Sequence, residues 1–178
     1  MPETLKKLNA DHRNIETLVQ IIEKEIETFE SGETPDYDLV RMILNYLLTY
    51  PDLHHHPLED AIVRKLKNIH DVPGAAELEL EHRKLAGTIR RFLAAITNIL
   101  NDDMLPRDWF SSIAREFSDF LRKHMRMEEV VIFPAAKREL NDEDWASIDA
   151  QISPQKDPLF GSDPDADFAD LRARLGME

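Results

Sequence analysis

Apolar residues recur every three or four positions along four long segments of the chain, which is the spacing of one face of an α-helix. The first segment ends at Ser31-Gly32 and predicts a helix over 3–30. The third predicts a helix over 74–101, and the fourth predicts one over 107–139 that bends or ends near Pro134. One histidine interrupts the apolar face of each of these helices, and the three are His12, His82 and His124.

The second segment is less regular than the others. The step that leads to His55 is five residues long, so the apolar face shifts register there. Pro51 and Pro57 lie at this step, and proline removes a backbone donor and disfavours a regular helix before it. We therefore expect a helix over 36–70 that is kinked near 51–57 and contains a local π-turn there.

Four amphipathic helices joined by short links predict an all-α fold, an up-down-up-down four-helix bundle over residues 1–140. Residues 141–178 form a C-terminal extension of different character. A short helix capped by Asn141 or Asp142 comes first, a loop rich in Pro, Asp and Ser follows, and the sequence DFADLRARL at 167–175 predicts a last helical turn or two. We expect this extension to pack on the bundle or to serve an interface.

Composition narrows the classes of function. No apolar run approaches the roughly 20 residues that a membrane span needs, and the N-terminus lacks the apolar core of a signal peptide, so we expect a cytoplasmic protein. The chain has no cysteine, which excludes disulfides, iron–sulfur clusters and thiolate zinc sites. Any metal must therefore be held by nitrogen and oxygen. The formal net charge of −13 argues against a nucleic-acid partner.

The chain contains an internal repeat. The sequence DHRNIETL begins at Asp11 and EHRKLAGTI begins at Glu81, and in both an acid, a histidine and an arginine are followed two positions later by an apolar residue. The lone histidine precedes a His-x-x-x-Glu pair by 43 residues in the first half and by 42 in the second. These pairs are His55–Glu59 and His124–Glu128. The chain therefore resembles two similar helical hairpins.

The two hairpins, packed face to face, would present four histidines and two glutamates to the interior of the bundle. Residues at i and i+4 lie on one helix face, and buried carboxylates are costly unless they are paired or bound to metal. Two bridging carboxylates would give each of two metals two nitrogens and two oxygens and would leave positions open for water or a small ligand. These donors suit iron, manganese or zinc, and the two-metal count favours iron. The predicted ligands are His12, His55, Glu59, His82, His124 and Glu128.

Neighbouring polar residues leave one alternative open. His54 and His56 flank His55, and His56 has an acid four residues later, Asp60, so the ligand in this stretch is not fixed by spacing alone. Asp60 and Glu129 each follow a predicted ligand. We expect them to contact the metal ligands from behind or to lie at the surface, and not to bind the metal directly. The residues expected at the surface or at a helix end are Arg13, Arg83 and His70.

The stretch HMRMEEVVIFP, from His124 to Pro134, resembles the H-x-x-x-E-E-x-x-x-F-P signature of hemerythrin-like proteins of the His-His-Glu cation-binding class. HHPLEDAIV at 55–63 is its first-half counterpart, although Arg64-Lys65 stand where Phe-Pro is usual. The DHR and EHR sequences match the lone-histidine positions, so the resemblance covers about 5–140. It implies a four-helix bundle around a non-haem di-iron centre. The four histidines would be terminal ligands, and the two glutamates would bridge the irons beside an oxo or hydroxo group.

One position departs from the oxygen-carrying members of that family, which have a His-x-x-x-His pair on the third helix. Leu78 stands four residues before His82, so one iron would have one nitrogen fewer and an extra open position. Such a site resembles family members linked to nitric oxide, peroxide or the repair of iron–sulfur clusters, although the cysteine-containing N-terminal module of some repair proteins is absent from this sequence.

We therefore expect a protein that binds or reduces O2, NO or peroxide. The alternatives are a sensor or iron-storage module that acts through a partner, and a metal-stabilised structural bundle. The tail contains the apolar residues Leu159, Phe160 and Phe168, which suggest a homodimer.

Overall fold

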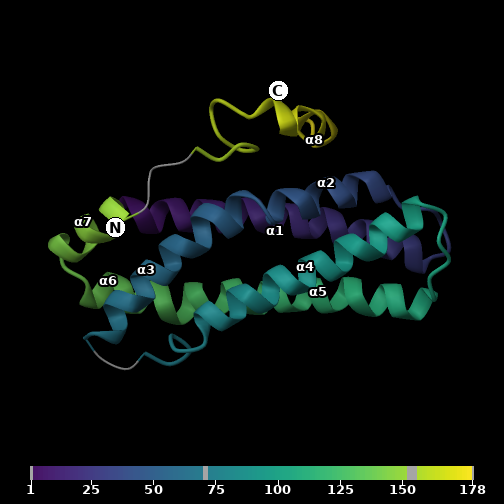
Figure 1. Cartoon of the computed structure of the whole chain (residues 1–178). Helices are drawn as coiled ribbons and strands as arrows, with labels where there is room; N and C mark the ends of the chain where they lie inside the picture. The colour runs from purple at the N-terminus through teal and green to yellow at the C-terminus, as the bar shows by residue number, and fades with distance from the viewer. Residues whose placement is uncertain (1, 70–71, 152–155, 178) are drawn as a thin grey trace.

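The computed structural model describes residues 2–69, 72–151 and 156–177, and no β-strand occurs among them (Figure 1). The expected all-α fold is confirmed. Four long helical stretches account for most of the chain: α1 (Glu3–Glu30); α2 (Tyr37–Leu47), the π-turn η1 (Pro51–His55) and α3 (His56–Lys67); α4 (Leu78–Leu100); and α5 (Arg107–Met127), the π-turn η2 (Glu128–Ile132) and α6 (Phe133–Glu139).

The four stretches lie side by side (Figure 1). Helix α1 packs against α2 and α5, helix α4 packs against the same two helices, and α3 packs against α4 and α6. Side chains from every stretch therefore meet in one shared interior. None of the described helices is both long and apolar enough to cross a lipid bilayer.

The π-turn η1 interrupts the second stretch where a kink is expected. The backbone N–H of His56 donates to the carbonyl of Pro51, five residues earlier, and Pro57 is the second residue of α3. Proline has no N–H, and its ring crowds the carbonyl four residues before it, so a wider turn accommodates it better than a regular α-turn. The kink and π-turn predicted near 51–57 are confirmed.

A second π-turn, η2, was not predicted. The backbone N–H of Phe133 donates to the carbonyl of Glu128, and Pro134 is the second residue of α6. The cause is the same as in η1, because each proline stands just after a five-residue π-turn. The bend expected near Pro134 is therefore present, and it begins at a predicted ligand.

The third helix begins later than predicted. We expected it over 74–101, whereas α4 starts at Leu78 and residues 73–77 form turns. Gly74 has a φ of 82°, a left-handed conformation that cannot continue into a right-handed helix. A Cβ atom at this position would also lie 3.1 Å from Sδ of Met127. The backbone conformation of Gly74 therefore prevents the helix from beginning at residue 74.

The C-terminal extension contains α7 (Asp142–Gln151), a 3₁₀ turn η3 (Ala166–Phe168) and α8 (Ala169–Arg174). The side chain of Asn141 accepts hydrogen bonds from the backbone N–H groups of Glu143 and Asp144, so Asn141 is the predicted cap of α7. The last helical turns predicted over 167–175 are also present.

The apolar residues of the tail pack on the same chain. Helix α8 contacts α2, and Leu159 is completely buried. The rings of Phe160 and Phe168 both pack edge-on against Tyr46. These residues do not form the exposed patch that suggested a homodimer. The homodimer itself stays a prediction.

The core consists of two apolar clusters with a polar layer between them. On α1, Leu5 and Leu8 belong to one cluster and the residues from Ile15 onward belong to the other, with His12 between them. The other three helical stretches change from one cluster to the other at or next to the predicted ligands. The fold thus brings four polar segments to the same level of the bundle.

Candidate metal centre

The polar layer contains all six predicted ligands. Each is at most 5% exposed, although polar and charged groups are rarely buried without a compensating partner. They come from all four helical stretches: His12, His55, Glu59, His82, His124 and Glu128.

Glu59 divides its two oxygens between two groups of histidines. Its Oε1 lies 3.3 Å from Nε2 of His12 and 3.2 Å from Nε2 of His55. Its Oε2 lies 3.4 Å from Nε2 of His82. One carboxylate therefore faces imidazoles from three different helices.

Glu128 makes the complementary set of contacts. Its Oε1 lies 3.4 Å from Nε2 of His82 and 3.2 Å from Nε2 of His124, while its Oε2 lies 3.4 Å from Nε2 of His12. Glu59 thus presents one oxygen to His12 and His55 and the other to His82. Glu128 presents one oxygen to His82 and His124 and the other to His12. This arrangement forms two neighbouring sets of two nitrogens and two oxygens.

Only one hydrogen bond, between Nε2 of His82 and Oε1 of Glu128 at 3.4 Å, joins these converging atoms of the described residues. Charge-assisted N–H···O bonds are typically about 2.7–2.9 Å long, whereas the contacts here measure 3.2–3.4 Å. Among the described residues, five of the converging atoms are buried with no hydrogen-bond partner: Nε2 of His12 and His124, both carboxylate oxygens of Glu59, and Oε2 of Glu128. Such groups are costly to bury, and metal cations between them would satisfy them. The residues present therefore fit a metal centre.

The outward-facing ring nitrogens are held by a second set of carboxylates. Within each hairpin, the acid that precedes the lone histidine contacts the paired histidine. Oδ2 of Asp11 lies 3.1 Å from Nδ1 of His55, and Oε2 of Glu81 lies 3.2 Å from Nδ1 of His124. Sequence spacing did not assign a role to Asp11 or Glu81, although both belong to the repeated acid–His–Arg motif.

Between the hairpins, the acid that follows each glutamate contacts the lone histidine of the other half. Oδ1 of Asp60 lies 2.9 Å from Nδ1 of His82, and Oε1 of Glu129 lies 3.0 Å from Nδ1 of His12. Together with the contacts inside each hairpin, these contacts connect each of the four helical stretches to the next around the bundle. A carboxylate that accepts from Nδ1–H leaves Nε2 to face the centre, which is the orientation a metal-binding histidine needs.

The carboxylates of the layer favour the protonated form of His12 and His82. Burial lowers the pKa of His12, but the adjacent carboxylates of Glu128 and Glu59 outweigh it and raise this pKa to about 11. Burial is likewise outweighed at His82, where the carboxylates of Asp60, Glu128 and Glu59 raise the pKa to about 11. The centre therefore favours positive charge, which bound metal can supply in place of protons.

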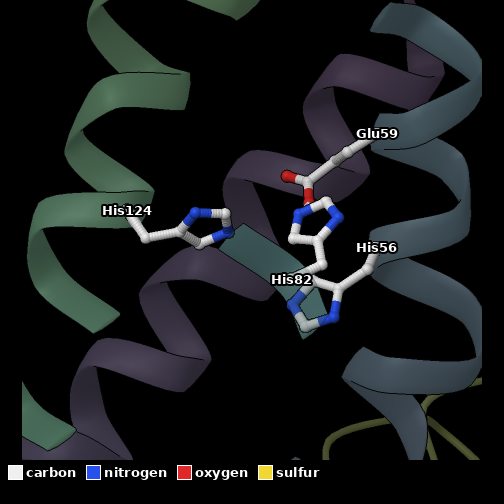
Figure 2. A group of neighbouring side chains, drawn as sticks. All are labelled: His56, Glu59, His82 and His124. Atoms are coloured by element: carbon white, nitrogen blue, oxygen red, sulfur yellow. Dashed lines mark ion pairs between the residues drawn. The ribbon is translucent and has the colours of Figure 1, made fainter. Parts of the chain in front are cut away.

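His56 lies beside the second histidine pair. It is 6% exposed, and its ring stacks on that of His82 with centroids 4.2 Å apart and an interplanar angle of 15°. Burial lowers the pKa of His56 to about 4, so this imidazole is neutral. Figure 2 shows His56 beside three predicted ligands, Glu59, His82 and His124. One potential donor atom from each of these four side chains lies within 4.8 Å of the others.

The remaining candidates lie away from the centre. Asp60 contacts the outward-facing Nδ1 of His82 rather than the converging atoms. His54 is only partly buried, and its ring lies 5.7 Å from that of Tyr50. Arg13 and Arg83 are exposed as predicted, and His70 lies outside the described residues.

Comparison with known proteins identifies a family. The family model described as "Hemerythrin HHE cation binding domain" matches residues 3–136, about three quarters of the chain. No curated protein matches the chain significantly. The matched span includes every residue of the buried cluster.

Proposed function

Because the chain belongs to the hemerythrin HHE cation-binding domain family, we propose that it is a cytoplasmic non-haem di-iron protein that binds or reduces O2, NO or peroxide. Manganese and zinc are the alternative metals. The proposal includes an up-down-up-down four-helix bundle over 1–140 with an extension over 141–178. The family membership supports cation binding, and the geometry of the cluster supports two ions.

The observation that carries the proposal is the division of each buried carboxylate between two histidine pairs. His12 and His55 would hold one ion, His82 and His124 would hold the other, and both glutamates would bridge them. Iron, when bound, supplies redox chemistry toward a small ligand. The protein's own contribution is to orient the imidazoles through Nδ1 and to exclude bulk water.

Burial restricts the ligand to small molecules. The inward-facing donor atoms of His12, Glu59 and His124 are buried, so a large metabolite cannot contact them. Two surface pockets approach the layer, one of about 440 Å³ lined in part by His56 and His82 and one of about 370 Å³ lined in part by His12. The position of these pockets beside the buried layer supports a diatomic molecule or peroxide as the ligand.

Metal analysis of the full chain tests this proposal. After anaerobic loading with Fe(II), we expect about two irons per chain in the wild type, by the count of donor sets. His124→Ala and Glu128→Ala each remove a central donor and should abolish stoichiometric iron. His54→Ala is the matched control, because it removes a neighbouring histidine outside the cluster, and it should retain both irons. Full iron content in both His124→Ala and Glu128→Ala would refute the assignment.

Turnover assays then separate the proposed activity from its alternatives. Catalytic loss of peroxide or nitric oxide by the iron-loaded protein supports reduction, and reversible uptake of O2 or NO supports binding. Iron that responds to neither ligand favours a storage or sensing module. Binding of zinc alone, with no redox change, favours a metal-stabilised structural bundle.

A further inference from the structure

A fifth histidine lies on one side of the cluster. His56 is the first residue of α3, next to His55, yet both side chains are buried. Consecutive residues of a regular helix point about 100° apart, so a typical helix would direct only one of them inward. Here η1 ends at His55, and its wider turn accompanies the burial of both rings.

The second hairpin has no counterpart to this residue. The position after His124 is Met125, which packs in the apolar core. The additional imidazole is therefore present once, on the side of His82 and His124 (Figure 2). This asymmetry breaks the two-fold relation of the other donors.

The surroundings of His56 resemble those of the four other histidines. Nδ1 of His56 faces Oδ1 of Asp52 at 3.7 Å, and Asp52 lies one turn earlier on the same helical stretch. The other four histidines also have a carboxylate behind Nδ1. The contact of His56 is longer than theirs, and its Nδ1 is buried without a hydrogen-bond partner among the described residues.

We propose that His56 is a third nitrogen donor to the ion held by His82 and His124. This inference rests on the proposed two-metal centre and specifies its composition: two imidazoles for one ion and three for the other. On the third helix, the position of the extra histidine of oxygen-carrying relatives holds Leu78, which is fully buried in an apolar cluster. His56 supplies that nitrogen from a different helix.

The test uses Co(II) alone as the probe, with the full chain and a competing chelator to measure the affinity of each ion. His56→Leu replaces the imidazole with an apolar side chain of similar size, which suits the buried position. We expect one of the two Co(II) ions to bind at least about tenfold more weakly, since loss of a supporting residue alone typically costs 10–100-fold. The other ion should change less than about twofold, and the visible Co(II) spectrum should change. His54→Leu, the same substitution two residues earlier, should alter neither affinity nor spectrum.

The outcomes distinguish this inference from the proposed function. Two Co(II) ions in His56→Leu, with wild-type affinities and spectrum, would overturn the role of His56 and leave the two-metal centre intact. Failure of the wild type to bind two ions would overturn the centre itself. His56→Gln, which keeps a polar side chain, provides a second variant if circular dichroism shows that His56→Leu is unfolded, and the same weakening of one ion is expected.

Discussion

At the scale of single residues, the centre depends on how each imidazole is oriented. Four carboxylates face the Nδ1 atoms from outside, and two more meet the Nε2 atoms from inside. The inner carboxylates are donors to the proposed metals, whereas the outer ones fix the ring and its tautomer. Loss of an outer carboxylate should therefore weaken metal binding without removing a donor.

Glu81→Gln tests this division of roles. Its carboxylate lies 3.2 Å from Nδ1 of His124, and the amide is nearly isosteric but uncharged. We expect metal affinity to fall by about 10–100-fold while the number of ions at saturation is unchanged. Competition with a chelator measures both quantities. Glu77→Gln, the same change at an exposed position one turn earlier, should have no effect. An equal loss of metal affinity in Glu81→Gln and Glu77→Gln would show that the effect comes from the change in net charge.

Sequence spacing could identify the six central residues but not their outer partners. Periodicity along one helix shows which residues share a face, and that is sufficient for His55 and Glu59. The contact between Asp11 and His55 joins two helical stretches. The apolar periodicity of one helix does not show which residues of another helix lie close to it. His56 was left open for a related reason, because the local rotation of a π-turn decides which neighbouring histidines face inward.

At the scale of helices, the sequence predicted which segments are helical better than where they end. The helix over 3–30 matches α1 because Gly32, with a φ of 91°, stops it cleanly. The start of α4 was placed too early because the apolar pattern says nothing about the φ angle of Gly74. The π-turn η2 was not predicted because it begins at Glu128. The i,i+4 spacing of His124 and Glu128 is therefore the same whether an α-turn or a π-turn follows.

Substitution of glycine tests this explanation of the start of α4. Gly74→Ala places a Cβ atom in a left-handed conformation and 3.1 Å from Sδ of Met127. We expect it to lower the free energy of unfolding by about 1–2 kcal/mol, measured by urea denaturation. Gly87→Ala is the matched comparison because Gly87 lies inside α4 with no atom within 4 Å of the added Cβ. It should raise the free energy of unfolding by about 0.5–1 kcal/mol. Stabilisation by both substitutions would contradict this account.

At the scale of the whole molecule, a polar layer divides the core and a tail closes one side of the bundle. Tyr46 of α2 connects the bundle to the tail, because its hydroxyl donates to Oδ2 of Asp157 at 2.8 Å. Oδ1 of the same aspartate accepts from the backbone N–H groups of Leu159 and Phe160. The partly buried carboxylate of Asp157 thus links the turn of the tail to α2.

Alkaline titration tests that link. Burial, reinforced by the charge of Asp157, raises the pKa of Tyr46 above its ordinary value of about 10. The folded protein keeps this proton at pH values where the unfolded chain releases it. The resulting stability is complete below about pH 10 and is lost as the pH rises, by up to about 1.4 kcal/mol per pH unit.

We expect Tyr46→Phe to be less stable than the wild type by about 1–2 kcal/mol near pH 7, because it loses a hydrogen bond to a charged acceptor. Above about pH 10 its stability should decline less steeply than that of the wild type, so the two curves converge. Burial also raises the pKa of Tyr50, so a residual decline is expected in the variant. Urea denaturation from about pH 7 to pH 11 measures both curves. If the stability of the wild type and that of the variant decline in parallel, the raised pKa of Tyr46 does not contribute to the stability of the folded protein.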